Sequence, residues 1–385
     1  MPSMPPGAGA PDAPVPSSAA LDQRFARLLH HTSKDTPNNA AFAPPIVNTS
    51  IYALPPQPSG TYQYARWGNP TWTALEDALA LLEDAETITF PSGMAAIAAV
   101  FYSLLKPGDR VLLPADGYYT TRICADKYFA PMGVEVDTCV TAALGERDLT
   151  GYRLVMIETP SNPALDLADI AAVSARAHAA GAVVVVDNTT MTPLGQRPLD
   201  LGADMVVSAD TKAVNGHSDV LFGHVSSRNA QLIGGVRDWR RVVGAIPGPH
   251  EAWLVHRGLE TLEVRWSRMT ASAFTIAQRL AEHPKVQALR YPGLPSHPAY
   301  ALAQRQMTSG GTLIALTLAD EAAAERFIAA CPYLRPATSF GGVHSSAERR
   351  ARWGDAVAPG FIRLSVGCEP TEALWQGIDT AFDAV

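Results

Sequence analysis

Lys212 is the residue whose type and position most directly indicate covalent chemistry. It lies in the stretch 208–219, directly after the apolar run 203–207, which is a predicted buried strand. A side chain in this position lies at the carboxyl end of its strand, where ligands bind in open α/β sheets. Its amine can form a Schiff base with a carbonyl cofactor there, or it can simply extend its charge to water. The other strand ends decide between these two interpretations.

Asp187 follows a second predicted strand, which contains the valines 183–186. A carboxylate at the end of a buried strand needs a partner, and a protonated pyridine nitrogen is one. The alternatives are an N-cap for the next helix and a metal ligand. Asp187 and Lys212 are 25 residues apart, about one strand–helix–strand step, so they can lie at neighbouring strand ends.

A short turn, Ser92-Gly93-Met94, connects the predicted strand 87–90 to the predicted helix 95–105. Gly93 allows the backbone to approach a phosphate, and the helix start offers N–H groups and the positive end of its dipole. A plain tight turn is the alternative interpretation.

Tyr118 follows the predicted strand 110–113 and either stacks on a pyridine ring or packs like other tyrosines. Thr211, next to Lys212, offers a hydroxyl group to a phosphate. Together with Asp187 and the turn 92–94, these residues match the needs of pyridoxal 5'-phosphate (PLP).

The elements that must position these residues alternate along the chain. Further strands are predicted at 134–136, 154–157 and 222–225, and helices at 71–82, 118–130 and 167–180. Continuous apolar strands between helices predict a mostly parallel sheet that is covered on both faces. After about residue 228 the pattern changes. A helical region at 253–283 with a break, strands at 312–318 and 361–365 and a helix at 321–330 predict a smaller α+β domain.

The N-terminal residues differ in composition from the rest. The first 20 residues are rich in Pro, Ala, Ser and Gly and predict a disordered leader rather than a signal peptide. A short amphipathic helix is predicted at 21–31, and the irregular segment 32–60 is of a kind that wraps over another part of the molecule or over a partner subunit.

Composition excludes several classes of function. Apolar residues make up 47% of the 385 residues, and the net charge of -7 offers no basic field for nucleic acid. No apolar run approaches the ~18 residues of a membrane span. The four cysteines have no metal-ligand spacing and no CxxC pair, so we expect no metal site and free thiols in a reducing cytoplasm.

Several spaced motifs go beyond these single residues. They are Tyr64-Ala65-Arg66-Trp67-Gly68-Asn69-Pro70-Thr71, Ser92-Gly93-Met94, Pro160–Pro163, Asp187–Thr189, Thr211–Asp219, Ser339–Val343 and Ile362–Gly367. On these motifs the chain resembles the transsulfuration (Cys/Met metabolism) family of PLP-dependent enzymes over about residues 40–380.

The resemblance implies a fold and a division into domains. The fold is α/β, the PLP-dependent transferase fold of type I, with a mostly parallel seven-stranded sheet in a large domain and a smaller α+β C-terminal domain. We expect the leader and an arm that crosses to the neighbouring subunit at 1–60, the PLP-binding domain at 61–252 and the C-terminal domain at 253–385.

The resemblance also implies roles for the cofactor-binding residues. Lys212 forms the Schiff base with PLP and shuttles protons, Asp187 pairs with the pyridine nitrogen, and Tyr118 stacks on the ring. The phosphate is held by the turn 92–94 and by Thr211.

Other implied roles concern the neighbouring subunit and the substrate. Tyr64 and Arg66 reach the phosphate of the neighbouring subunit, so an active dimer is expected, usually paired into a homotetramer, and Tyr64 or Tyr118 can assist proton transfer. Asn162, Ser339 and Arg363 orient the ring oxygen and the substrate α-carboxylate, and the planar fork of Arg363 suits a carboxylate.

Three positions depart from the family pattern. Ala209 replaces the usual phosphate-binding serine, for which Ser208 or Ser92 is a candidate substitute. His344 stands where cystathionine γ-lyases usually have glutamate, and it is expected to face the distal part of the substrate. Thr120 stands where methionine γ-lyases usually have cysteine, which argues against that activity.

The implied function is a carbon–sulfur lyase of amino-acid metabolism in the cytoplasm. The leading hypothesis is a cystathionine γ-lyase, which forms cysteine, 2-oxobutanoate and ammonia, and the second is a cystathionine β-lyase. A cystathionine γ-synthase or O-acylhomoserine sulfhydrylase, or a lyase for another γ-substituted amino acid, comes third. A PLP-binding regulatory protein without turnover is the alternative from a different class.

Overall fold

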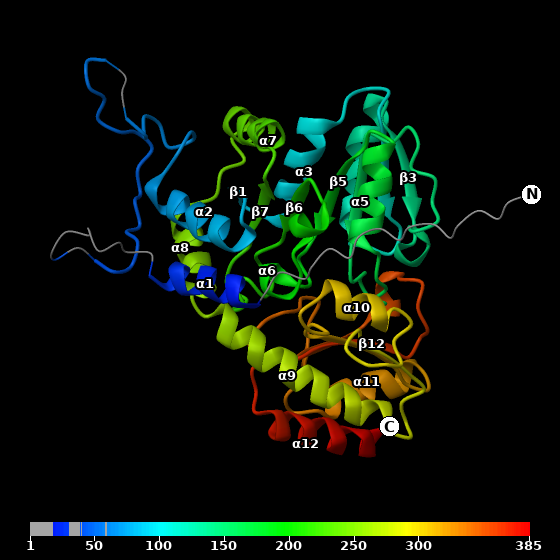
Figure 1. Cartoon of the computed structure of the whole chain (residues 1–385). Helices are drawn as coiled ribbons and strands as arrows, with labels where there is room; N and C mark the ends of the chain where they lie inside the picture. Colours follow the sequence, from blue (N-terminus) through cyan, green and yellow to red (C-terminus); the bar gives the residue numbers. More distant parts are fainter. Residues whose placement is uncertain (1–17, 31–38, 40, 58–59) are drawn as a thin grey trace, which may run out of the picture.

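Two β-sheets organise the chain in the computed structural model, which describes residues 18–30, 39, 41–57 and 60–385 (Figure 1). The first sheet has seven strands in the order β1-β7-β6-β5-β4-β2-β3. Within it, β7 is antiparallel to both its neighbours, and the remaining pairs are parallel. Its strands are β1 (Glu86–Phe90), β2 (Arg110–Pro114), β3 (Glu135–Cys139), β4 (Leu154–Glu158), β5 (Val183–Asp187), β6 (Met205–Ser208) and β7 (Gly223–Ser227). The predicted mostly parallel seven-stranded sheet is therefore confirmed.

Helices cover both faces of this sheet. They are α2 (Pro70–Glu83), α3 (Gly93–Leu104), α5 (Ile170–Ala179), α6 (Thr192–Gly195), α7 (Ala230–Val243) and α8 (Pro249–Leu259). Alternate residues of β4 join different clusters: Leu154 and Met156 pack with α3 and α7, whereas Val155 and Ile157 pack with α5. Burial on both faces explains why the sequence shows these strands as continuous apolar runs.

The second sheet has the order β10-β11-β12-β9-β8 and lies toward the C-terminal end of the molecule (Figure 1). Its strands are β8 (Ala288–Arg290), β9 (Leu313–Thr317), β10 (Arg335–Pro336), β11 (Ser346–Arg349) and β12 (Phe361–Ser365). The helices of this part are α9 (Leu262–Ala281), α10 (Tyr300–Gln306), α11 (Glu321–Ala330) and α12 (Thr371–Ala381). Ile362 and Leu364 of β12 pack with α9, α11 and α12. Successive strand residues point to opposite faces, so Arg363 points away from these helices, toward the first sheet.

Some elements differ from the prediction. The helix predicted at 118–130 is only α4 (Tyr119–Cys124), continued by a π turn and a 3₁₀ turn that contains Pro131, a residue without an N–H for a helical hydrogen bond. Helices α7 and α12 were not predicted, since glycines inside them weaken the helical pattern. The break expected in 253–283 falls between α8 and α9 and is confirmed. The domain limits at 61, 252 and 253 stay predictions.

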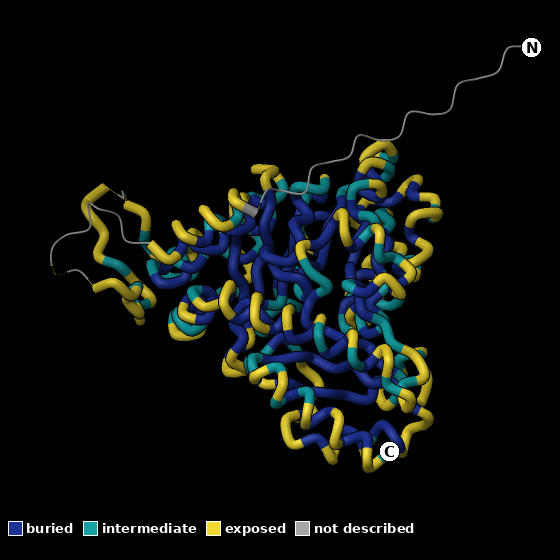
Figure 2. Tube along the Cα trace, turned by 60° about the horizontal axis from the view of Figure 1, so that its bottom comes forward, coloured by how far each residue is buried: buried dark blue, intermediate teal, exposed yellow. Residues whose placement is uncertain are grey.

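The N-terminal part forms one helix and an extended segment. Helix α1 (Ser18–Leu29) confirms the predicted amphipathic helix, because its Phe25 and Leu28 pack in the cluster around α2. The segment 41–57 projects from the body and is mostly exposed (Figure 2). Helix α1 begins three residues before the predicted start, so the prediction of a leader was wrong for residues 18–20. Residues 1–17 of the predicted leader and part of the arm lie outside the described residues. No described helix has both the length and the apolar character needed to span a bilayer.

Candidate active site

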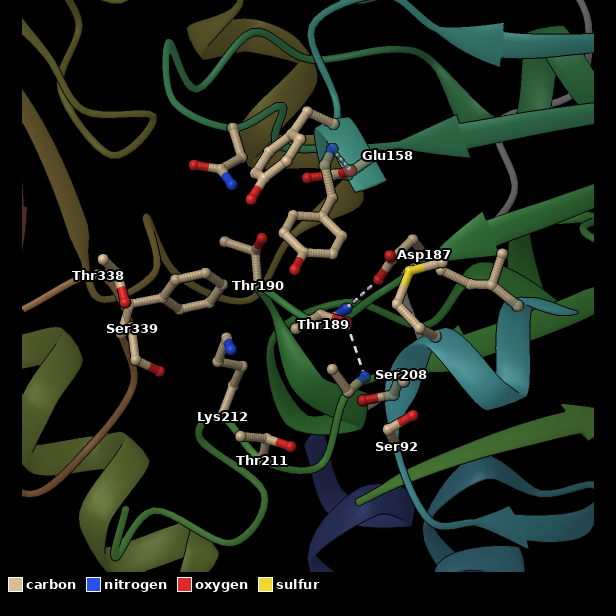
Figure 3. A pocket seen from close by; sticks show the side chains of 18 of the residues that line it. Ser92, Glu158, Asp187, Thr189, Thr190, Ser208, Thr211, Lys212, Thr338 and Ser339 are labelled. Carbon is tan, nitrogen blue, oxygen red and sulfur yellow. Dashed lines mark hydrogen bonds between the residues drawn. The ribbon is translucent and has the colours of Figure 1, made fainter. Parts of the chain in front are cut away.

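A cavity of about 320 Å³ lies between the carboxyl ends of the first sheet and the second sheet. Such a volume suits a small-molecule ligand. The predicted site residues that line it are Ser92, Gly93, Met94, Tyr118, Asn162, Asp187, Thr211, Lys212, Ser339 and Arg363. Figure 3 shows the Lys212 amine pointing into this cavity, with Thr338 and Ser339 on one side and Asp187 on the other.

Lys212 is held by a loop that closes on itself directly after β6. The Lys212 N–H donates to the Ala209 carbonyl at 3.0 Å, and the Gly216 N–H donates to the Lys212 carbonyl at 2.8 Å. Burial lowers the pKa of Lys212, and Arg363 lowers it further, while Asp187 opposes both. A lysine amine that loses its proton more easily is suited to act as nucleophile and base.

Two carboxylates stand side by side at the ends of β4 and β5. Glu158 and Asp187 are paired in register. Burial raises the pKa of Asp187, and it raises the pKa of Glu158 well above the usual range, with the charge of Asp187 adding to it. The Tyr118 N–H donates to Glu158 at 2.6 Å, so this carboxyl positions the residue predicted to stack on the cofactor.

Thr189 connects Asp187 to the loop that carries Lys212. The Thr189 N–H donates to Asp187 at 3.0 Å, and the Thr189 hydroxyl accepts from the Ala209 N–H at 2.8 Å (Figure 3). Thr189 therefore connects the Asp187 carboxylate to the backbone of the loop that carries Lys212.

The start of α3 packs closely against the same loop. A Cβ atom at Gly93 would lie 2.6 Å from the Ala209 Cβ, so only glycine fits there. Ser92 caps α3 by accepting from the Ala95 N–H at 3.1 Å. The buried hydroxyl of Ser208 also lines the cavity and has no hydrogen-bond partner within the described protein. Of the two predicted substitutes for the serine missing at 209, Ser208 therefore has the more available hydroxyl.

Arg363 reaches the cavity from β12. Its Nη1 donates to the Asn162 side chain at 2.6 Å, and its Nη2 donates to the Thr338 carbonyl at 2.6 Å and to Glu348 at 3.1 Å. Burial lowers the pKa of Arg363 to about 10, and the neighbouring charge of Arg350 adds to this, so the guanidinium stays charged at neutral pH.

Several lining residues were missed at the sequence level. The Phe340 ring is close to the side chains of both Lys212 and Arg363. The Lys212 Nζ lies 5.4 Å and the Arg363 Cζ 5.1 Å from its centroid. Arg350 and Trp353 also line the cavity. Phe340 stands inside the predicted motif 339–343, which was the available signal, whereas no motif contained Arg350 or Trp353.

Glu348 joins these missed residues to Arg363. Its carboxylate accepts from Arg350 Nη1 at 2.8 Å and from Trp353 Nε1 at 2.5 Å, in addition to Arg363. One buried carboxylate thus holds three residues of the cavity wall.

Three predicted residues do not line the cavity of their own chain. The Arg66 guanidinium contacts the Arg241 carbonyl and lies 5.3 Å from the centroid of the Tyr64 ring. The Tyr64 side chain is 42% exposed, and His344 is exposed on the surface. The structure therefore gives these residues no contact with the site within one subunit.

The arrangement fits PLP. A lysine amine, a carboxylate on the neighbouring strand end, an exposed tyrosine face and a glycine-tight helix start surround one cavity, and an unpartnered hydroxyl faces it. Lys212, Asp187 and Tyr118 would hold the ring, and Gly93 and Thr211 the phosphate.

Fold and site together define a PLP-dependent enzyme of fold type I. The family model of Cys/Met metabolism PLP-dependent enzymes matches residues 26–383, and the chain belongs to this family. The predicted family, its fold and its cofactor are thereby confirmed.

The chain is similar to several enzymes of this family. A Streptomyces coelicolor protein assigned as a cystathionine gamma-lyase is 48% identical over 88% of both chains. The L-methionine gamma-lyase of Pseudomonas deceptionensis is 39% identical over 93% of this chain and 97% of the relative. The crystal structure of cystathionine gamma synthase from Xanthomonas oryzae in complex with cystathionine superposes with a TM-score of 0.88 at 33% identity, covering 95% of this chain and 98% of the other.

Relatives at 36% and 37% identity are named cystathionine beta-lyase and cystathionine gamma-synthase. These comparisons support the predicted class of PLP-dependent carbon–sulfur lyases and leave the individual reaction to be inferred.

Proposed function

We propose that this enzyme is a lyase of the cystathionine γ-lyase type, which converts cystathionine and water to cysteine, 2-oxobutanoate and ammonia. The observation that carries the proposal is that Lys212 and Arg363 face one cavity, each within 5.4 Å of the Phe340 ring centroid. A base for the α-proton and a fork for the α-carboxylate then act on the same amino acid. The γ-lyase assignment of the Streptomyces coelicolor relative supports this choice within the family.

Different residues of the chain remove the α-proton and bind the α-carboxylate. Bound PLP would supply an aldehyde for the substrate amine and a ring that withdraws electrons from the α-carbon. Lys212, whose pKa is lowered by burial, removes the α-proton. Arg363 holds the α-carboxylate, and Asn162, hydrogen-bonded to Arg363, keeps the guanidinium in place.

The bond changes on the substrate follow from γ-elimination. A proton also leaves Cβ, the Cγ–S bond breaks, and the sulfur takes a proton and leaves as cysteine. Cγ then gains a proton, and the resulting four-carbon enamine reacts with water to give 2-oxobutanoate and ammonia. Tyr118 carries a phenol at the cavity and is the residue of this chain that we assign to assist the proton transfers. Arg350 and Trp353 form the wall that the distal part of the substrate meets.

Product analysis tests the reaction. The purified enzyme with cystathionine should release 2-oxobutanoate and cysteine. Pyruvate and homocysteine would instead identify a cystathionine β-lyase, the second candidate, which relatives of that name support. If neither oxo acid forms while an O-acylhomoserine is consumed in the presence of a thiol, the γ-synthase or sulfhydrylase reaction is correct.

We further propose that the active site is shared between two subunits of a homotetramer, with Tyr64 and Arg66 reaching the phosphate of the partner. The exposure of Tyr64 and of apolar arm residues such as Ile51 (70%) and Leu54 (57%) supports this, because large apolar side chains in a projecting segment are typical of contact surfaces. The four free cysteines are consistent with the proposed cytoplasmic location.

Subunit mixing tests the shared site. Arg66→Ala and Lys212→Ala should each be inactive, and mixed tetramers should regain part of the activity, because some sites then receive both intact residues. Mixed tetramers that stay inactive contradict a shared site, and a monomeric mass in light scattering contradicts the assembly.

A further inference from the structure

Three buried charged side chains meet at the loop after β6 that carries Lys212, here called the lysine loop, and none of them lines the cavity. Both oxygens of Asp210 lie 2.8 and 2.9 Å from His224 Nδ1, and Glu83 Oε1 lies 3.4 Å from His224 Nε2. His224 and Asp210 are fully buried, and Glu83 is 3% exposed. They come from three elements: the end of α2, the loop after β6 and strand β7.

The charge of His224 depends on these carboxylates. Burial by itself lowers the pKa of His224, but Asp210 and then Glu83 outweigh it and raise the pKa to about 10. The ring is therefore an imidazolium at neutral pH. Buried ion pairs contribute little net stability compared with apolar residues of similar volume, so their presence calls for another explanation.

The position of Asp210 in the lysine loop explains why a buried ion pair is present here. Asp210 is two residues before Lys212 and one before Thr211, and the Asn215 N–H donates to its carbonyl at 2.9 Å. On the other side of this loop, the Phe222 N–H donates to the Thr211 hydroxyl at 2.9 Å. The loop is thus attached to the start of β7 at two points, Thr211 to Phe222 and Asp210 to His224.

Between these two points lies Gly223, which contacts the phosphate side of the site. A Cβ atom at Gly223 would lie 2.7 Å from the Gly93 backbone at the start of α3. The residues 222–224 therefore touch both the lysine loop and the predicted phosphate-binding turn. His224 also faces Ser208 across the β6–β7 pair, and Thr89 across the β1–β7 pair.

We propose that His224, which lies between Asp210 and Glu83, is a positioning residue. These three residues, here called the clamp, keep Lys212 and Thr211 at fixed positions relative to the turn at Gly93, and so set the affinity for PLP. The proposal rests on the PLP chemistry of the proposed function. Such a clamp matters more in this chain because Ala209 has no hydroxyl to offer to a phosphate. No residue of the clamp touches the cofactor cavity itself.

The chain offers a matched control. Glu76, also on α2, forms a partly buried ion pair with Arg240 and accepts from the Thr89 N–H at 2.9 Å. Glu76 lies on the same helix as Glu83, whereas Arg240 lies on α7, and neither forms a hydrogen bond or an ion pair with the lysine loop. Glu76→Gln therefore disturbs an ion pair and its hydrogen bonds to Thr89, the strand neighbour of His224, without removing a residue of the clamp.

The experiment titrates apoenzyme with PLP and follows the visible absorbance of the bound cofactor, alongside thermal unfolding of the apoenzyme. His224→Leu should raise the dissociation constant of PLP about tenfold or more, whereas Glu76→Gln should leave it within about twofold. Because His224→Leu leaves Asp210 buried without its partner, the double variant Asp210→Leu/His224→Leu provides a second measurement. It should regain part of the thermal stability, because only Glu83 then remains buried without its partner, and it should still bind PLP weakly.

Two outcomes overturn the proposal. One is a double variant that binds PLP as tightly as the wild type, since the ion pair would then be only structural. The other is an equal loss of affinity in Glu76→Gln, since general destabilisation would then explain both. Failure of the wild-type protein to bind PLP would instead refute the proposed function.

Discussion

The two walls of the cavity are built in different ways. On the cofactor wall, Lys212, Asp187 and Glu158 stand at the ends of apolar strands, and burial is the main cause of the pKa change in all three. On the substrate wall, Arg363 lies in the middle of β12, and its guanidinium is held by Asn162, a backbone carbonyl and Glu348. Burial also lowers the pKa of Arg363, but only to about 10, so this group stays charged.

This difference suits the cofactor wall to reaction steps and the substrate wall to binding of the substrate. Burial changes the ease with which a group gains or loses a proton, which serves reaction steps. Fixed hydrogen bonds instead hold a permanently charged group in one orientation, which serves binding of a planar carboxylate. Changes on the cofactor wall should therefore alter turnover and cofactor absorbance, and changes on the substrate wall should alter KM and selectivity.

The largest effect is expected on the cofactor wall. Lys212→Ala should lower kcat by about 10⁴-fold, because the Schiff-base amine and the base are lost together. The visible absorbance of the holoenzyme should change as well. The exposed Lys127 provides the control, and Lys127→Ala should behave as the wild type. Unchanged absorbance in Lys212→Ala would remove Lys212 from its proposed role.

Arg363→Lys should have the next largest effect. A lysine keeps the charge but loses the planar fork, so KM should rise between about 10- and 100-fold. Steady-state kinetics with cystathionine measures this. The cofactor absorbance should be unchanged, and a variant that instead lost its cofactor would contradict the separation of the two walls.

A smaller effect concerns the pH dependence of stability. Because burial holds the pKa of Glu158 well above its usual range, the folded apoenzyme keeps a proton that unfolding releases once the pH exceeds the ordinary carboxyl pKa of about 4.3. Stability from this group is therefore present at low pH and decreases as the pH rises toward the folded pKa.

Glu158→Gln removes this dependence. Between pH ~5 and ~8 the free energy of unfolding of the variant should fall by about 1 kcal/mol less than that of the wild type. Urea unfolding of both apoproteins at several pH values measures the difference. Parallel curves would contradict a protonated Glu158 in the folded state.

The smallest effect is expected at the rim of the substrate wall. Trp353 is 56% exposed and is held to Glu348 by its indole N–H. Trp353→Ala should lower kcat/KM for cystathionine about fivefold, because an aromatic contact of ~1 kcal/mol is lost, with no change in cofactor binding. Trp353→Phe should recover part of the loss. An equal loss for short and long substrates would argue against contact with the distal group.

The two walls also differ in how well the sequence predicted them. Lys212 and Asp187 could be recognised because each follows a continuous apolar run, and parallel strands bring their carboxyl ends to one edge. The turn 92–94 could be recognised because its glycine lies between a predicted strand and a predicted helix. Arg363 was recognised through its motif alone. The segment 348–353 is rich in charge and would be expected to be solvated, yet Glu348 and Arg350 are buried.

What the sequence determined by itself was therefore the fold class, the family and the set of residues at the strand ends, because strand periodicity and local motifs are short-range properties. The tertiary structure alone decided that Glu348 joins Arg363, Arg350 and Trp353, and that His224 meets Asp210 and Glu83. Glu83 and His224 are 141 positions apart. A contact over such a separation depends on how α2 packs on the sheet. Because this packing buries the Glu83 and His224 side chains, each charge needs a partner of opposite sign.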